Sequence, residues 1–177
     1  MITRLLSSAA VLAVSSTAAM ADYSITILHT NDFHSRFEPI SRFDSGCSEE
    51  SNAEGKCFGG SARMMTAIET AKARTDNWLL VDGGDQFQGS LFYTYYKGKA
   101  AAEFNNTQGN DRKTVGNHEI DDGPEILREF VGNVNFPILM SNADISGEPL
   151  LSDVIQKSIV IEKGGEKIGL IVLSPED

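Results

Sequence analysis

Three short segments of the chain contain residue types that bind divalent metal ions. Each segment lies where an apolar, strand-like run ends, and together they contain Asp32, His34, Asp85, Asn117 and His118. A set of carboxylate and imidazole groups suits Zn, Mn, Co or Fe better than Ca. Two such ions held close together can bind phosphoryl oxygens and activate water for in-line attack. The pattern therefore predicts a two-metal hydrolase site.

Four of these residues are expected to be the metal ligands. Asp32 and His34 are separated by a single residue, so on an extended backbone their side chains point the same way and reach one ion. The carboxylate of Asp85 follows Gly83 and Gly84 and can bridge two ions. Asn117 offers a neutral carbonyl oxygen that fits beside a bridging carboxylate.

His118 and Asp121 are expected to be the catalytic pair. On an extended backbone His118 faces away from Asn117, which leaves it free to donate a proton to the leaving oxygen. Asp121 follows three residues later and can hold the other ring nitrogen. Taken singly, each residue has an ordinary explanation, because Asp and Asn next to Gly are common in turns. Their joint occurrence at three strand ends favours a functional site.

Strands and helices alternate along the chain in a way that brings these strand ends together. The expected strands cover residues 23–30, 78–81, 111–115 and 136–140, and the expected helices cover residues 61–74, 94–106 and 124–131. Ser61 is the expected N-cap of the first helix. A hairpin is expected around Gly164 and Gly165, between residues 158–161 and 168–173. This order predicts an α/β fold with a mixed sheet.

The size and charge of the chain limit its partners. Its 177 residues suffice for one domain with a sizeable core. The net charge of −10 argues against a nucleic acid as partner, because binding to a phosphate backbone needs a basic surface. An anionic substrate requires metal ions to supply local positive charge.

Residues 1–21 have the pattern of a signal peptide. A short basic region containing Arg4 precedes an uncharged stretch over residues 5–20, and residues 19–21 form a small-x-small cleavage site before Asp22. The alternative is a membrane-spanning helix, but the stretch is short and no positive charges follow it. We therefore expect export to the periplasm or the extracellular space, with no membrane attachment after cleavage.

The two cysteines are expected to form a disulfide. Cys47 and Cys57 bracket a polar loop over residues 48–56. In an exported protein this arrangement indicates a disulfide. A metal–thiolate site is the alternative, but two ligands without nearby partners are too few.

Four motifs in this order resemble those of the exported 5′-nucleotidases of the calcineurin-like metallophosphoesterase superfamily. They cover residues 27–36, 59–63, 80–90 and 114–121. The resemblance implies two divalent ions, one held by Asp32 and His34, with Asp85 bridging both and Asn117 on the second. It also implies a four-layer sandwich of two mixed sheets flanked by helices. The implied substrates are nucleotide monophosphates, nucleotide sugars or cyclic nucleotides.

The chain differs from that family in how far it extends. The family completes its metal shell with histidines from later Gly-His motifs and adds a nucleotide-binding domain, whereas this sequence has three histidines and ends at Asp177. Residues 22–177 are therefore expected to be the N-terminal portion of the catalytic domain, weakly active or inactive alone. The alternatives are a non-enzymatic exported remnant with at most weak metal binding, or a cyclic-nucleotide or nucleotide-sugar phosphohydrolase of the same superfamily.

A second difference lies in the strand before Asn117. The family has an apolar strand of the Tyr-Asp-Ala-Met-Thr type, and residues 110–114 here are Asn-Asp-Arg-Lys-Thr. Charged residues in a buried strand are costly unless they are paired. We therefore expect this strand to be distorted or locally degraded.

Overall fold

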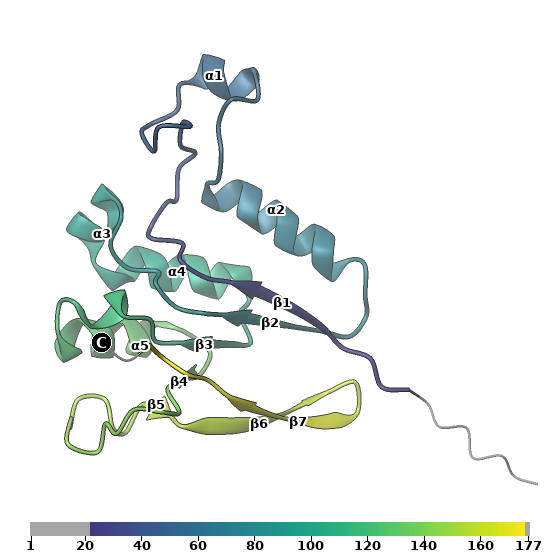
Figure 1. The fold of residues 1–177 in the computed structure, drawn as a ribbon, viewed down its shortest axis with the longest axis vertical. Helices are drawn as coiled ribbons and strands as arrows, with labels where there is room; N and C mark the ends of the chain where they lie inside the picture. The colour runs from purple at the N-terminus through teal and green to yellow at the C-terminus, as the bar shows by residue number, and fades with distance from the viewer. Residues whose placement is uncertain (1–21, 176–177) are drawn as a thin grey trace, which may run out of the picture.

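Five strands form a parallel sheet whose spatial order follows their order in the chain (Figure 1). The computed structural model describes residues 22–175, so the predicted signal peptide lies outside the described residues. The strands are β1 (Thr26–Thr30), β2 (Trp78–Asp82), β3 (Arg112–Thr114), β4 (Ile138–Leu139) and β5 (Ile155–Gln156). Because every pair is parallel, all carboxyl ends of these strands lie at one edge of the sheet.

Most of the helices cover one side of this sheet, whereas α1 (Glu49–Ala53) lies apart from it on the loop between β1 and α2 (Ser61–Lys72), and an antiparallel hairpin lies on the other side of the sheet (Figure 1). The other helices are α3 (Leu91–Tyr96), α4 (Gly98–Gln108), the 3₁₀ helix η1 (His118–Ile120) and α5 (Pro124–Asn133). The hairpin consists of β6 (Ser158–Lys163) and β7 (Glu166–Ile171). No helix within residues 22–175 is long and apolar enough to cross a membrane.

The α/β class and most of the expected elements are confirmed, with local differences. The expected helix over residues 94–106 is two helices, because the backbone turns at Lys97 with a φ of 51°. Gly60, rather than Ser61, is the N-cap of α2, and the Ser61 hydroxyl donates to the carbonyl of Phe37. The main sheet is parallel, and antiparallel strand pairing occurs in the separate hairpin among the described elements.

Strand β3 is regular, so the expectation that it is distorted was wrong. Lys113 pairs in register with Asp82 of β2 and Ile138 of β4. Its side chain is fully buried, and its ammonium lies 2.7 Å from a carboxylate oxygen of Asp82. Asp111 accepts the backbone N–H of Leu80 at 2.9 Å. The charges of Asp111 and Lys113 are tolerated because partners from other segments satisfy them. The buried Nε of Arg112, in contrast, has no hydrogen-bond partner among the described residues.

Cys47 and Cys57 are joined by a disulfide, which confirms the pairing expected from the sequence. The bond closes a loop that contains the short helix α1, which the sequence did not indicate. Ile40 forms bridges with Gly46 and Phe58 at the base of this loop. The disulfide therefore fixes a segment that has little regular structure of its own.

We predict that Cys47 and Cys57 resist alkylation until the protein is reduced. Protein purified without reductant and unfolded in denaturant should gain no alkyl groups in intact-mass analysis, and two after reduction. Reduction should lower stability by about 2–3 kcal/mol, because the short loop regains conformational freedom in the unfolded chain. A Cys47→Ser variant, which leaves Cys57 as a free thiol, is the positive control. Two alkylated thiols in unreduced wild-type protein would contradict the bridge.

Candidate metal centre

The loops that follow β1 and β2 lie side by side and bring three of the predicted ligands together. The backbone N–H of Asp32 donates to the carbonyl of Gly84, and that of His34 donates to Asp85, both at 3.0 Å. One ligand atom from each of Asp32, His34 and Asp85 lies within 4.8 Å of the other two. Residues far apart in the sequence therefore form one cluster of donors.

All three clustered residues have left-handed backbone conformations. The φ angles are 52° at Asp32, 49° at His34 and 55° at Asp85. Residues other than glycine rarely adopt this region, and such strain is concentrated at functional sites. Asp32 and His34 lie beyond the end of β1, so they converge through a turn. The expectation that they alternate on an extended strand gave the correct grouping for an incorrect reason.

The ring of His34 is held in an orientation that suits metal binding. Its Nδ1 lies 3.1 Å from the carbonyl oxygen of Phe87, so it is assigned as the protonated donor. This leaves Nε2 as the electron-pair donor, 3.7 Å from a carboxylate oxygen of Asp32. Metal-binding histidines commonly donate their second ring N–H to a backbone carbonyl in this way.

Asp85 connects this cluster to the third segment. One of its carboxylate oxygens accepts the backbone N–H of His118 at 3.0 Å. The approach is so close that a Cβ at Gly116 would lie 2.3 Å from the same carboxylate oxygen. Only glycine fits at position 116 without displacing Asp85.

The structure places Asn117 and His118 in the same loop, in a helical conformation. Asn117 is the N-cap of η1 and has φ −68° and ψ −35°, so the expectation of an extended backbone was wrong for this pair. The His118 ring lies 5.1 Å from the His34 ring, centroid to centroid. Asn117 is half-buried and adjoins the N–H that binds Asp85. All four predicted ligands are therefore carried by loops that contact one another.

His118 and Asp121 form the hydrogen bond that the sequence predicted. The distance from His118 Nδ1 to the Asp121 carboxylate is 2.8 Å. This hydrogen bond is the main reason that the pKa of His118 lies above its ordinary value. The side-chain amide of Gln88 donates to the same Asp121 oxygen at 2.9 Å. Gln88 was not among the predicted site residues, although it lies within the motif over residues 80–90.

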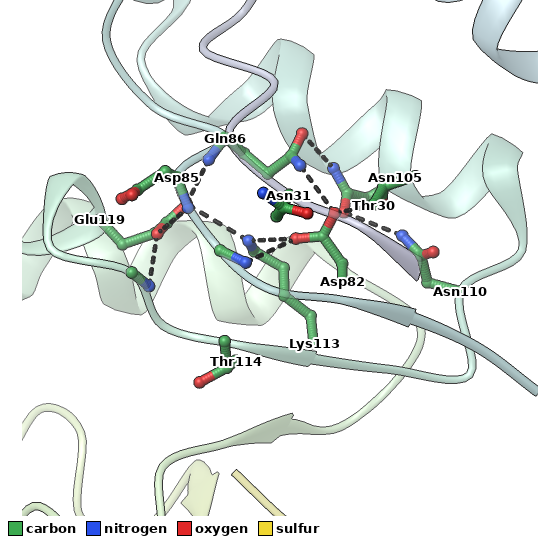
Figure 2. Close-up of polar contacts among 12 residues, drawn as sticks. Thr30, Asn31, Asp82, Asp85, Gln86, Asn105, Asn110, Lys113, Thr114 and Glu119 are labelled. Carbon is green, nitrogen blue, oxygen red and sulfur yellow. Dashed lines mark hydrogen bonds and ion pairs between the residues drawn. The ribbon is translucent and has the colours of Figure 1, made fainter. Parts of the chain in front are cut away.

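Glu119 is a further residue of the site that was not predicted from the sequence. Its buried carboxylate accepts the backbone N–H groups of Asp85 and Gln86 at 2.8 Å and of Gly116 at 2.7 Å (Figure 2). Burial alone would raise the pKa of Glu119, but Lys113 and these N–H groups hold it below its ordinary value. The one sequence feature that could have indicated a role for Glu119 is its position directly after Asn117 and His118. Glu119 ties the loop after β2 to the loop after β3.

The family follows from a comparison with known proteins. The model of the calcineurin-like phosphoesterase family matches residues 25–176. The chain belongs to this family. The matched region contains every residue of the cluster described above, and the parallel sheet flanked by helices is the fold of its solved relatives.

Curated relatives and solved structures of the family include several 5′-nucleotidases. The chain is 42% identical to the 5′-nucleotidase of Diplobatis ommata, over 85% of this chain and 26% of the relative. It is 40% identical to the Mus musculus 5′-nucleotidase, over 86% of this chain and 26% of that relative. The chain therefore spans about a quarter of the length of these relatives.

Two solved structures share the fold. The 5′-nucleotidase precursor from Thermus thermophilus superposes with a TM-score of 0.73 at 34% identity, over 85% of this chain and 28% of that one. The NAD nucleotidase of Haemophilus influenzae superposes with a TM-score of 0.69 at 26% identity, over 85% of this chain and 26% of that one.

We predict that Gly116→Ala weakens metal binding, because the added Cβ displaces the Asp85 carboxylate. The expected loss of Mn²⁺ affinity is about 10- to 100-fold, as for other changes beside a metal ligand. Gly132→Ala is the matched control, since a Cβ at Gly132 meets nothing within 4 Å. Isothermal titration calorimetry measures the affinity, and circular dichroism checks the fold. Equal Mn²⁺ binding by the two variants would contradict the proposed packing.

Proposed function

We propose that the protein is an exported, metal-dependent phosphoesterase of the 5′-nucleotidase type. The observation that supports this most directly is the convergence of Asp32, His34 and Asp85, each in a left-handed conformation, beside the His118–Asp121 pair. Membership of the calcineurin-like phosphoesterase family and the 5′-nucleotidase relatives support the same reaction. The reaction is hydrolysis of a phosphate ester of a nucleotide.

The donor set fits divalent metal ions. In this proposal Asp32 and His34 would hold one ion, Asp85 would be shared between two ions, and Asn117 would hold the second. The orientation of His34 by Phe87 supports this assignment, because it leaves Nε2 free toward the cluster. Bound Zn, Mn, Co or Fe ions would supply the positive charge that polarises a phosphate ester. They would also allow a protein with a net charge of −10 to accept an anionic substrate.

His118 is proposed to donate a proton to the leaving oxygen. Asp121 binds Nδ1, so Nε2 is the nitrogen that would donate the proton. The raised pKa of His118 favours the protonated ring, which a proton donor requires. Gln88 donates to the same Asp121 oxygen and so limits the rotation of this carboxylate.

Two further parts of the proposal concern substrate and location. The names of the relatives support nucleotide monophosphates. A pyrophosphate bond is a second candidate, because the fold also matches an NAD nucleotidase. Export to the periplasm or extracellular space is supported by the disulfide, since such bonds persist in oxidising compartments.

We predict that the purified protein releases phosphate from AMP only with metal present and far more slowly than a full-length relative, because the chain spans about a quarter of the length of such relatives. Cleavage of AMP, NAD and cyclic AMP is measured for each substrate with Mn²⁺ and with excess EDTA. Released inorganic phosphate reports hydrolysis of AMP, and chromatography detects the products of NAD and cyclic AMP. Hydrolysis of AMP that EDTA abolishes supports the nucleotidase. Faster cleavage of NAD would favour the pyrophosphate alternative. Cleavage of AMP that excess EDTA leaves unchanged would contradict the proposal.

We predict that substitutions at the site separate metal binding from proton transfer. Asp85→Ala should remove both metal and activity, because this carboxylate serves two ions. His118→Ala should retain metal while turnover falls about 100- to 10,000-fold, the usual cost of losing a proton donor. His29→Ala is the control, since His29 lies in the first motif but is exposed on β1.

Elemental analysis and steady-state kinetics are measured on the same preparations. The dyad assignment fails if His118→Ala strips the metal as thoroughly as Asp85→Ala does. The whole site assignment fails if His29→Ala has the larger effect.

A further inference from the structure

A fully buried lysine lies directly behind the candidate metal centre. The ammonium of Lys113 lies 2.7 Å from Asp82 Oδ1 and 3.3 Å from Glu119 Oε1, and all three side chains are 0% exposed. Burial alone would lower the pKa of Lys113, but the two carboxylates raise it above its ordinary value. A buried ammonium persists only where such partners surround it.

Each of the two carboxylates that bind Lys113 also holds part of the metal-ligand loops. Asp82 accepts the backbone N–H of Gly84 at 3.0 Å and the side-chain amide of Gln86 at 2.8 Å. Glu119 accepts the three backbone N–H groups that flank Asp85 and Asn117. Figure 2 shows Lys113 beneath these loops with its ammonium directed at Asp82. The ammonium is thus a single charged group that contacts both carboxylates.

We propose that Lys113 is a positioning residue for the metal centre. Its ammonium fixes the carboxylates of Asp82 and Glu119, which in turn hold the loops after β2 and β3 in their metal-binding arrangement before any ion binds. The part of the inference that concerns metal affinity rests on the proposed function, whereas the ordering of the loops does not.

Hydrogen exchange of the metal-free protein tests the ordering of the loops. In Lys113→Met, the backbone N–H groups of Asp85, Gln86 and Gly116 should exchange about tenfold faster or more, because Glu119 loses its counter-ion. Exchange in the β6–β7 hairpin should not change. Lys167→Met is the matched control, since Lys167 is exposed on β7, and it should leave all three amides protected. Unchanged exchange at these amides in Lys113→Met would overturn the proposal.

If Lys113→Met does not fold, a double variant is measured in its place. The double variant Lys113→Met/Asp82→Asn removes the ammonium together with the opposing charge of Asp82, so that no uncompensated charge remains at that carboxylate. The same acceleration at the Asp85, Gln86 and Gly116 amides is expected. Wild-type protection of these amides in the double variant would overturn the proposal.

Mn²⁺ titration of the same proteins tests the consequence for the metal centre. Lys113→Met should weaken Mn²⁺ binding about 10- to 100-fold, the usual effect of a group that orients metal ligands. Because Lys113 acts in part through Glu119, the losses caused by Lys113→Met and Glu119→Gln should be less than additive when the two are combined. Fully additive losses would overturn this route of action. The two parts of the inference can fail separately. If the wild-type protein binds no Mn²⁺ but Lys113→Met still accelerates exchange at the three amides, the proposed function is refuted and the ordering role of Lys113 is retained.

Discussion

The buried ion cluster of Lys113, Asp82 and Glu119 is the constraint on which the site depends. In a water-excluded interior each of these charges needs partners with good geometry, and removing one partner of such a pair typically costs about 3–5 kcal/mol. The requirement is met by a lysine on β3, an aspartate at the end of β2 and a glutamate in η1. The ion pairs therefore join β2, β3 and η1 at the positions where the loops of the site begin.

The strained loops above the cluster require this support. Left-handed backbone at a residue other than glycine costs roughly 1–3 kcal/mol, and Asp32, His34 and Asp85 all adopt it. The loops also bring the carboxylates of Asp32 and Asp85 close to each other, which like charges oppose. Hydrogen bonds between the loops and the Glu119 carboxylate offset part of this cost. A bound cation would offset more of it, which is the physical basis for assigning metal chemistry to this cluster.

The sequence predicted those features that a local pattern encodes. Helices α2 and α5 and the β6–β7 hairpin have clear periodicity or a Gly-Gly turn, whereas β5 has two residues and gives no periodic signal. The gathering of strand ends followed from the alternation of strands and helices. The left-handed ligand positions did not, because hydrogen bonds between distant loops determine them. The distortion expected at β3 was wrong for the same reason: the partners of Lys113 lie 31 residues before it and in the turn after it.

The single turn of 3₁₀ helix explains how neighbouring residues can perform different tasks. A 3₁₀ helix has 3.0 residues per turn, so successive side chains point in different directions and those at i and i+3 lie above one another. His118 and Asp121 are such a pair, which accounts for their hydrogen bond. Glu119 is turned inward toward Lys113, where its side chain is buried. Asn117 precedes the turn and adjoins the N–H that binds Asp85. The proposed ligand Asn117, the proposed proton donor His118 and the structural carboxylate of Glu119 are therefore consecutive residues whose side chains point in different directions around one helical turn.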